Sequence, residues 1–202
     1  MAYLVLVRHT QSQWNAKGLW TGLTDISLSE SGREKARCFL CKKLKDIHFD
    51  RAFTSVLKRS KETLEEIKTA LGGNFPITED KALNERDYGE FTGKNKWQIK
   101  EEVGDEEFLK IRRGFDHPIP GGETLKDVFN RVVPYYQAQI LPYLKNGKNV
   151  LIVAHGNSLR ALVKYLENIS DADISGLEIE TGEILIYEID KTGNIATKAK
   201  RG

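Results

Sequence analysis

Two patterns of apolar residues alternate along the chain, one typical of buried strands and the other of amphipathic helices. The continuous apolar run at residues 3–7 predicts a strand that is buried on both faces, because successive side chains point to opposite faces and all of them are apolar. Residues 51–55, 75–78 and 183–190 predict further strands. The segment 149–168, NVLIVAHGNSLRALVKYLEN, predicts a strand, a turn and a helix in succession.

Four further segments predict helices, three of them with apolar residues three or four positions apart on one face. They span residues 25–50, 56–71, 104–115 and 123–147. In the first segment, Ser31 and Glu34 have the spacing of a capping box, and in the last, Pro134 is expected to kink the helix. Residues 79–96 are polar without a clear period and predict a long loop.

The order of these elements predicts the fold class. Strands separated by helices along the whole chain favour an α/β fold with a mostly parallel central sheet and helices on both faces. No change of composition resembles a linker, and the sequence shows no internal repeat. We therefore expect one domain over residues 1–202.

The composition is that of an ordinary soluble globular protein, with 202 residues, 40% of them hydrophobic and 30% charged. A net charge of +2 is too small to indicate nucleic-acid binding, and the Lys and Arg residues of 191–202 predict a solvated tail. No apolar run approaches the roughly 18 residues of a membrane span, and the N-terminus lacks the pattern of a signal peptide. The expected location is the cytoplasm, with no membrane or nucleic-acid partner.

Cys38 and Cys41 form a C-x-x-C pair inside the first predicted helix, well past its start. Redox pairs place the first cysteine at a helix N-terminus, where the helix dipole lowers the thiol pKa. No second pair completes a zinc site, and the sequence has no other ligand cluster. We expect both cysteines to pack as ordinary helix residues, and we expect no metal.

Polar side chains follow three of the predicted strands, where an open α/β sheet binds its ligands. The segments are VRHTQS, TSVLKR and AHGNSLR, and each leads into a helix whose first N–H groups can bind an anion. They would gather Arg8, His9, Arg59, His155 and Asn157. Glu85, Arg86, Tyr88 and Lys96 of the long loop and Arg112 and Arg113 of the short helix would join them.

Two histidines, several arginines and one carboxylate predict a phosphate site with an acid/base group, provided that these side chains converge. Taken singly, each of these residues is more often structural or exposed than catalytic. The strand-end Arg-His and His-Gly elements carry more weight together, because the fold rule predicts that they meet.

Seven segments occur in the order found in the histidine phosphatase superfamily, which the chain resembles over nearly its whole length. They are LVRHTQSQWN, TGLTDISLSESG, FTSVLKRSKET, LNERDYGEFTGKNK, IRRGF, GGETLKDV and VLIVAHGNSLRALV. The Arg-His element alone implies only the superfamily. The NERDYG and GKNK elements and the Arg-Arg pair are similar to those with which the cofactor-dependent phosphoglycerate mutases recognise the carboxylate and phosphate of their substrate.

The resemblance implies roles for the reacting residues. His9 would be the nucleophile, attacking a phosphoryl group with a neutral ring nitrogen to form phosphohistidine, while its other ring nitrogen donates a proton to a backbone carbonyl. Arg8, Arg59 and His155 would surround the phosphoryl oxygens. Glu85 would exchange a proton with the substrate hydroxyl.

The resemblance also implies the reaction and its ligands. The chain would interconvert 3-phosphoglycerate and 2-phosphoglycerate, with 2,3-bisphosphoglycerate as the priming phosphoryl donor and without a metal. The residues expected to bind the substrate are Asn15, Thr21, Gly22, Arg59, Tyr88, Lys96, Arg112, Arg113, Gly156 and Asn157. Dimers are common among the mutases, so a homodimer is an expectation by analogy alone.

Two departures from the mutase pattern keep alternatives open. Thr10 stands where the family usually has glycine, and threonine disfavours the positive φ that glycine allows. Only residues 114–120 separate Arg113 from Gly121, where longer mutases have a loop that covers the site and excludes water. A phosphatase of the same superfamily is therefore one alternative, and a catalytically silent module that binds phosphorylated ligands is another.

Overall fold

The computed structural model describes residues 1–201, and within them six strands form one sheet in the order β3-β2-β4-β1-β5-β6. The strands are β1 (Ala2–Arg8), β2 (Arg51–Thr54), β3 (Ile77–Glu79), β4 (Val150–Ala154), β5 (Ile184–Ile189) and β6 (Ile195–Arg201). β1, β2, β3 and β4 are parallel, whereas β5 is antiparallel to β1 and β6 to β5. The prediction of a mostly parallel sheet is confirmed.

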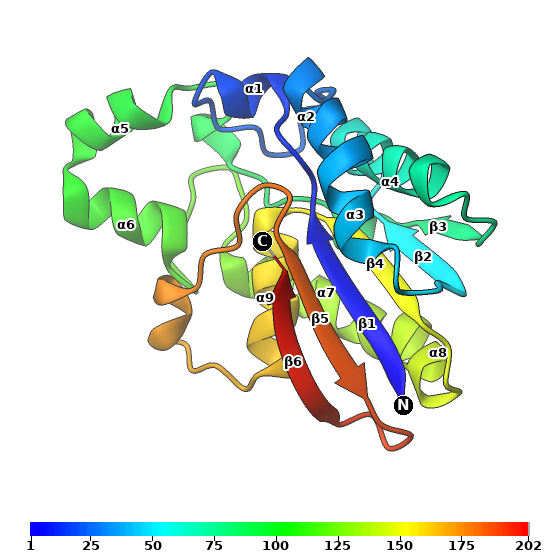
Figure 1. Cartoon of the computed structure of the whole chain (residues 1–202). Helices are drawn as coiled ribbons and strands as arrows, with labels where there is room; N and C mark the ends of the chain where they lie inside the picture. Colours follow the sequence, from blue (N-terminus) through cyan, green and yellow to red (C-terminus); the bar gives the residue numbers. More distant parts are fainter. Residues whose placement is uncertain (202) are drawn as a thin grey trace.

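Helices cover both faces of the sheet (Figure 1). The α-helices are α1 (Gln13–Ala16), α2 (Glu30–Glu34), α3 (Cys41–Leu44), α4 (Lys58–Leu71), α5 (Lys96–Val103), α6 (Asp105–Arg113), α7 (Leu125–Tyr135), α8 (Leu141–Lys145) and α9 (Gly156–Leu166). π-Helices span Lys35–Leu40 and Tyr136–Ile140, and 3-10 helices span Lys81–Leu83, Gly89–Phe91 and Asp173–Gly176. α5 and α6 lie beside the sheet, toward the end where β1 and β4 finish (Figure 1).

The side chains of β1 explain why its sequence is apolar without alternation. Val5 and Val7 point to one face, where they pack with residues of α3 and α4. Leu4 and Leu6 point to the other face and pack with residues of α7 and α9. Both faces are therefore core, and the strand has no polar side. A third, smaller apolar cluster joins α5 and α6 to the segment around Trp20.

The last strand corrects the sequence prediction. Residues 195–201, expected to be part of a solvated tail, form β6 at the edge of the sheet and pair with β5. Lys200 forms an ion pair with Glu183, and Arg201 forms one with Asp46. Most side chains of β6 are exposed, which is why the composition looked like that of a tail; charged edge strands of this kind resist pairing with other chains.

Two helix starts also differ from the sequence prediction. Ser29, not Ser31, caps α2, because the Ser29 side chain accepts a hydrogen bond from the Gly32 N–H at 3.1 Å. α5 was not predicted at all. Its cap, Asn95, lies at the end of the loop predicted over residues 79–96, and Ile99 is the only buried residue of this helix. A helix with so few buried residues has almost no apolar period to detect.

Pro134 does not end its helix. It lies near the end of α7, and the helix continues directly into the π-helix Tyr136–Ile140 and then α8. Just past the proline, the hydrogen-bond pattern changes from that of an α-helix to that of a π-helix. This is the local perturbation at the position where the sequence predicted a kink.

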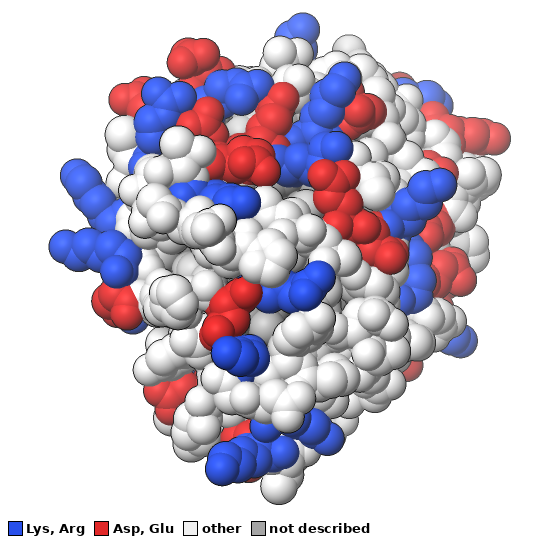
Figure 2. Space-filling model, turned by 90° about the vertical axis from the view of Figure 1, so that its right-hand side faces the viewer, with Lys and Arg blue, Asp and Glu red and all other residues white. Residues whose placement is uncertain are grey.

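The remaining expectations concern the surface. Lys and Arg side chains alternate with Asp and Glu side chains over the face in Figure 2, which fits the small net charge.

In residues 1–201, Cys38 is exposed and Cys41 buried, and neither is in a disulfide. Over the same residues no His, Cys, Asp or Glu side chains group as a metal site would need. No helix in this part of the chain is both long and apolar enough to cross a membrane.

Candidate active site

His9 and His155 meet because the strands that precede them are neighbours in the sheet. β1 and β4 are parallel and pair in register up to Arg8 and Ala154. The His9 N–H continues this pairing with a hydrogen bond of 2.9 Å to the carbonyl of Ala154. The two imidazole rings then lie edge to face, with centroids 5.0 Å apart. The predicted convergence of the two strand ends is therefore present.

The imidazole of His9 is held as a neutral ring with a defined tautomer. Its Nδ1 lies 2.7 Å from the carbonyl oxygen of Thr10, so Nδ1 carries the proton and donates it. Burial, and then the positive charges of Arg59 and Arg8, lower the pKa of His9 well below its ordinary value. A neutral ring with a proton on Nδ1 has its lone pair on Nε2, which is the state that a nitrogen nucleophile needs.

Thr10 fits the turn after β1 without the backbone conformation that glycine favours. Among the non-glycine residues described, only Asn168 has a positive φ, so Thr10 has the negative φ that a β-branched residue tolerates. The Thr10 side chain is buried, and its N–H donates to the Thr63 hydroxyl at 3.2 Å. Thr63 lies on α4 and donates to the carbonyl of Arg59 at 2.7 Å, which links this turn to the site.

Arg59 lies in the first turn of α4, shortly after the end of β2, and is almost completely buried. Its two terminal nitrogens donate to the carbonyls of Gly22 at 2.8 Å and Thr24 at 2.9 Å. These bonds hold the guanidinium beside His9. Gly22 has a φ of +52°, so the turn that presents its carbonyl suits glycine. Burial lowers the pKa of Arg59 to about 10, which leaves it charged at neutral pH.

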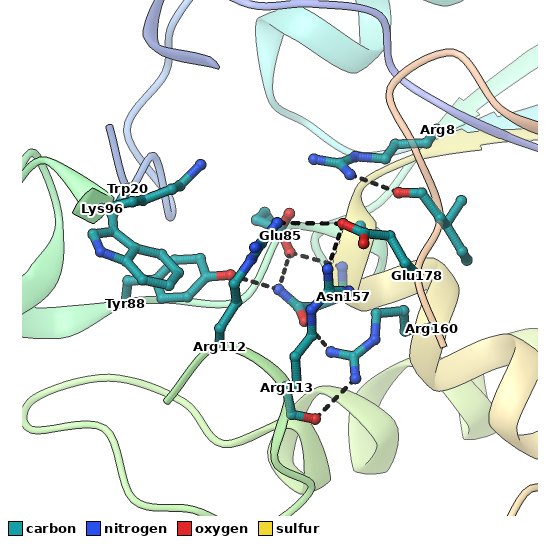
Figure 3. A pocket seen from close by; sticks show the side chains of 12 residues that line it. Arg8, Trp20, Glu85, Tyr88, Lys96, Arg112, Arg113, Asn157, Arg160 and Glu178 are labelled. Atoms are coloured by element: carbon teal, nitrogen blue, oxygen red, sulfur yellow. Dashed lines mark hydrogen bonds and ion pairs between the residues drawn. The ribbon is translucent and has the colours of Figure 1, made fainter. Parts of the chain in front are cut away.

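Two adjacent cavities contain nearly all the residues predicted for the site. His9 lines the first cavity together with four predicted substrate-binding residues, which are Asn15, Thr21, Gly22 and Arg59. The second cavity (Figure 3) contains four others, which are Arg112, Arg113, Gly156 and Asn157. Four residues line both cavities, namely Arg8, Glu85, Tyr88 and Lys96.

His155 and Arg86 are the exceptions, because they line neither cavity. Arg86 is fully buried and donates to the carbonyl of Ile111 at 2.8 Å. His155 is fully buried behind His9, and its Nε2 lies 2.7 Å from the hydroxyl of Ser55. Burial, and then the charge of Arg59, lower the pKa of His155 well below its ordinary value. In this structure His155 is therefore a neutral neighbour of the His9 ring rather than an exposed cation.

Glu85 is a buried carboxylate at the boundary between the two cavities. Its Oε1 accepts hydrogen bonds from the N–H of Arg86 at 2.8 Å and from the N–H and side-chain amide of Asn157, both at 3.1 Å. Burial favours the protonated form, but these bonds and the charges of Arg8 and Arg59 outweigh it and lower the pKa of Glu85. The carboxylate is therefore ionised and able to accept a proton.

Arg160 is a residue of the site to which the sequence assigned no role. One turn after Asn157 on α9, it donates to the Asn157 side-chain oxygen at 2.9 Å. This bond orients the Asn157 amide so that its nitrogen donates to Glu85 and to the Tyr88 hydroxyl, the latter at 2.8 Å. The i, i+3 spacing within HGNSLR was the only signal that could have indicated this pairing.

Lys96 is held against an aromatic side chain rather than in open solvent. Its ammonium group lies 5.6 Å from the centre of the Trp20 ring, a residue that the sequence also did not indicate. Burial, followed by the charges of Arg8 and Arg112, lowers the pKa of Lys96 to about 8. The lysine is therefore charged at neutral pH but close to losing its proton.

The comparison with known proteins identifies the family. A sequence model of the histidine phosphatase superfamily (branch 1) matches residues 4–200. The chain belongs to the histidine phosphatase superfamily. The superfamily expected from the sequence is thereby confirmed. The matched residues include the Arg-His and His-Gly strand ends, which line or adjoin the two cavities.

Relatives within this superfamily match nearly the whole chain. A protein of Cytophaga hutchinsonii named 2,3-bisphosphoglycerate-dependent phosphoglycerate mutase is 48% identical over 93% of this chain and 88% of its own length. A protein of the same name from Parvibaculum lavamentivorans is 47% identical over 96% of this chain and 94% of its own length.

Solved structures have the same fold. Bacillus stearothermophilus YhfR superposes with a TM-score of 0.84 at 27% identity, covering 98% of this chain and 95% of its own. A mycobacterial glucosyl-3-phosphoglycerate phosphatase superposes with a TM-score of 0.83 at 22% identity, covering 100% of this chain and 98% of its own. At that identity the second likeness concerns the fold alone.

The protonation state of His9 can be tested directly. At about pH 6 an ordinary histidine is largely protonated, whereas we expect the His9 ring to stay neutral with its proton on Nδ1, because burial and the charges of Arg59 and Arg8 lower its pKa. Long-range 1H–15N spectra of the imidazole nitrogens, assigned with His9→Gln, provide the measurement. Signals from a ring protonated on both nitrogens at this pH would contradict the expectation.

The pKa of Lys96 predicts how anion binding depends on pH. Raising the pH through about 8 removes the Lys96 proton and with it one positive charge of both cavities. The affinity for inorganic phosphate, measured by calorimetry, should then fall by up to about tenfold per pH unit above that value. Lys96→Arg stays charged over this range and should remove the fall. A fall that persists unchanged in Lys96→Arg would assign it to another group.

Proposed function

We propose that the protein is a 2,3-bisphosphoglycerate-dependent phosphoglycerate mutase, an isomerase of glycolysis and gluconeogenesis that interconverts 3-phosphoglycerate and 2-phosphoglycerate. The observation that carries the proposal is the pair of adjacent cavities, one with His9 and Arg59 and the other with Arg112 and Arg113. A small substrate with a phosphoryl group at one end and a carboxylate at the other matches this pair. The names of the two relatives, 47 to 48% identical, support it.

His9 acts as the nucleophile in this proposal. The Nε2 lone pair of the neutral ring attacks phosphorus, a P–N bond forms, and the P–O bond to the departing oxygen breaks. Arg8 and Arg59 stabilise the charge on the phosphoryl oxygens during the transfer. The bond from Nδ1 to the carbonyl of Thr10 fixes the ring and stabilises the positive charge that develops on it.

Glu85 is the acid/base group. When the substrate hydroxyl attacks the phosphoryl group on His9, the ionised carboxylate accepts the hydroxyl proton and the P–N bond breaks. In the opposite direction the same carboxyl group returns the proton to the departing oxygen. The hydrogen bonds from Arg86 and Asn157 hold Oε1, which leaves Oε2 as the oxygen free to exchange the proton.

The far end of the substrate is bound by the other cavity. Arg112 and Arg113 have planar guanidinium groups suited to a carboxylate, and Lys96 adds a positive charge between the two cavities. Asn15, Thr21 and Gly22 bind the phosphoryl end in the cavity of His9. Tyr88, Gly156 and Asn157 also line this second cavity and would bind the substrate there.

The donors present fit 2,3-bisphosphoglycerate as the priming ligand. Within residues 1–201, Arg8 Nε and the Thr21 hydroxyl are buried without a hydrogen-bond partner, and both residues line the cavity of His9. A ligand with two phosphoryl groups and a carboxylate matches this cavity and the adjoining arginine pair. When bound, it supplies the phosphoryl group that loads His9 before the first turnover.

One assay separates this proposal from the phosphatase and the silent binding module. With catalytic 2,3-bisphosphoglycerate present, the protein should convert 3-phosphoglycerate to 2-phosphoglycerate with little release of free phosphate. His9→Gln should abolish the conversion and the acid-labile labelling from 32P-bisphosphoglycerate, whereas His48→Gln, at an exposed position, should keep both. Free phosphate without isomerisation would instead identify a phosphatase, and silence in both measurements a binding module.

Replacing the acid/base group should slow transfer without weakening binding. Glu85→Gln keeps an oxygen for the N–H of Arg86 but cannot accept the substrate proton, so we expect kcat to fall about 10²- to 10⁴-fold with little change in KM. Glu90→Gln, which changes an exposed glutamate of the same segment, is the matched control and should be unaffected. Equal turnover in Glu85→Gln and the unchanged protein would remove Glu85 from this role.

A further inference from the structure

The second cavity already contains a carboxylate that is not part of the proposed mechanism. Oε1 of Glu178 accepts a hydrogen bond of 3.2 Å from Arg112 and also forms an ion pair with the guanidinium of Arg113 (Figure 3). These are the two side chains proposed to bind the carboxylate of the substrate. Glu178 therefore makes, within the chain, the contacts that a bound carboxylate would make.

The segment that carries Glu178 is held along the wall of the cavity by arginine side chains. The carbonyl of Leu177 accepts from Arg113 at 3.3 Å and from Arg160 at 3.0 Å. The carbonyl of Ile179 accepts from Arg8 at 2.6 Å, and the Ile179 side chain is only 2% exposed. The backbone on both sides of Glu178 is thus fixed, which confines the glutamate side chain to the mouth of the cavity.

The side chain of Glu178 is itself free to leave. It is 52% exposed, and within residues 1–201 its side chain forms hydrogen bonds or ion pairs with Arg112 and Arg113 alone. Burial alone would raise the pKa of Glu178, but the hydrogen bond from Arg113 and the charges of both arginines outweigh it and lower the pKa. Glu178 is therefore an ionised carboxylate whose own end of the ion pairs is open to solvent, whereas Arg112 and Arg113 are 35% and 11% exposed. A ligand carboxylate that takes over both arginines can displace Glu178 without leaving either charge unpaired.

We propose that Glu178 is a specificity-determining residue that occupies the Arg112–Arg113 pair in the free enzyme and is displaced by the carboxylate of the substrate. The inference rests on the proposed function, because it assigns those two arginines to that carboxylate. A ligand that has a phosphoryl group but no carboxylate binds beside His9 and leaves the Glu178 ion pairs intact. Glu178 thereby sets how much affinity the carboxylate of a ligand adds.

Direct binding tests this proposal without turnover. The dissociation constants of 3-phosphoglycerate and glycerol 3-phosphate are measured by calorimetry in the absence of 2,3-bisphosphoglycerate. Glu178→Gln should tighten 3-phosphoglycerate binding about two- to fivefold and leave glycerol 3-phosphate unchanged, because only the first ligand competes with the Glu178 carboxylate. Glu180→Gln removes an exposed charge two residues away, outside this cavity, and should change neither constant.

Three results would overturn the proposal. They are an unchanged or weaker affinity for 3-phosphoglycerate in Glu178→Gln, an equal gain for both ligands, and the same gain in Glu180→Gln; the last two indicate general charge repulsion. Glu178→Ala and the thermal midpoints of all variants check that the fold is intact. The binding measurement needs no turnover, so the two proposals can fail separately. Tighter binding of 3-phosphoglycerate alone by Glu178→Gln, in a protein without isomerase activity, would support the role of Glu178 and refute the proposed function. Isomerase activity without tighter binding in Glu178→Gln would support the proposed function and refute the role of Glu178.

Discussion

The parallel pairing of β1 with β4 is the constraint on which the site depends. Both strands are central in the sheet and buried on both faces, so their ends cannot shift without disturbing two apolar layers. The hydrogen bond from His9 to the carbonyl of Ala154 extends this pairing by one residue beyond the strand. The nucleophile proposed for the reaction is thus positioned by the backbone of the core, and Arg8 and His155 are positioned with it.

The positive charges around His9 lower the pKa of both key ionisable groups, which leaves His9 neutral and Glu85 negatively charged. Arg8 and Arg59 disfavour a proton on His9, which keeps its Nε2 lone pair available, and they favour the ionised form of Glu85. Such a gathering of cations, Arg59 buried and Arg8 partly buried, is tolerated because backbone carbonyls accept hydrogen bonds from them. Gly22, Thr24 and Ile179 supply these carbonyls from loops rather than from the sheet.

The parts of the site that could be predicted from the sequence are those that local pattern and sheet topology determine. The strand ends with Arg8, His9 and His155 follow from apolar runs and from the rule that ligands bind at the carboxyl edge of a parallel sheet. Thr10 stands where the family usually has glycine, and in the structure it adopts a negative φ. Its N–H donates a hydrogen bond to Thr63, a residue distant in the sequence that no local pattern could connect to Thr10. Glu178 lies in a segment without a period, and its place beside Arg113 depends on contacts more than 60 residues apart.

The sheet positions the residues proposed to react, whereas α5 and α6 carry residues proposed to bind the far end of the substrate. The residues proposed to react come from the ends of β1, β2 and β4 or lie against them, whereas Lys96, Arg112 and Arg113 are carried by α5 and α6. That pair of helices is packed by a small apolar cluster around Trp20 that is separate from the two core layers of the sheet. Changes in α5 and α6 can therefore alter which ligand end is recognised while the His9 environment stays intact, a physical basis on which one superfamily can serve different phosphorylated substrates.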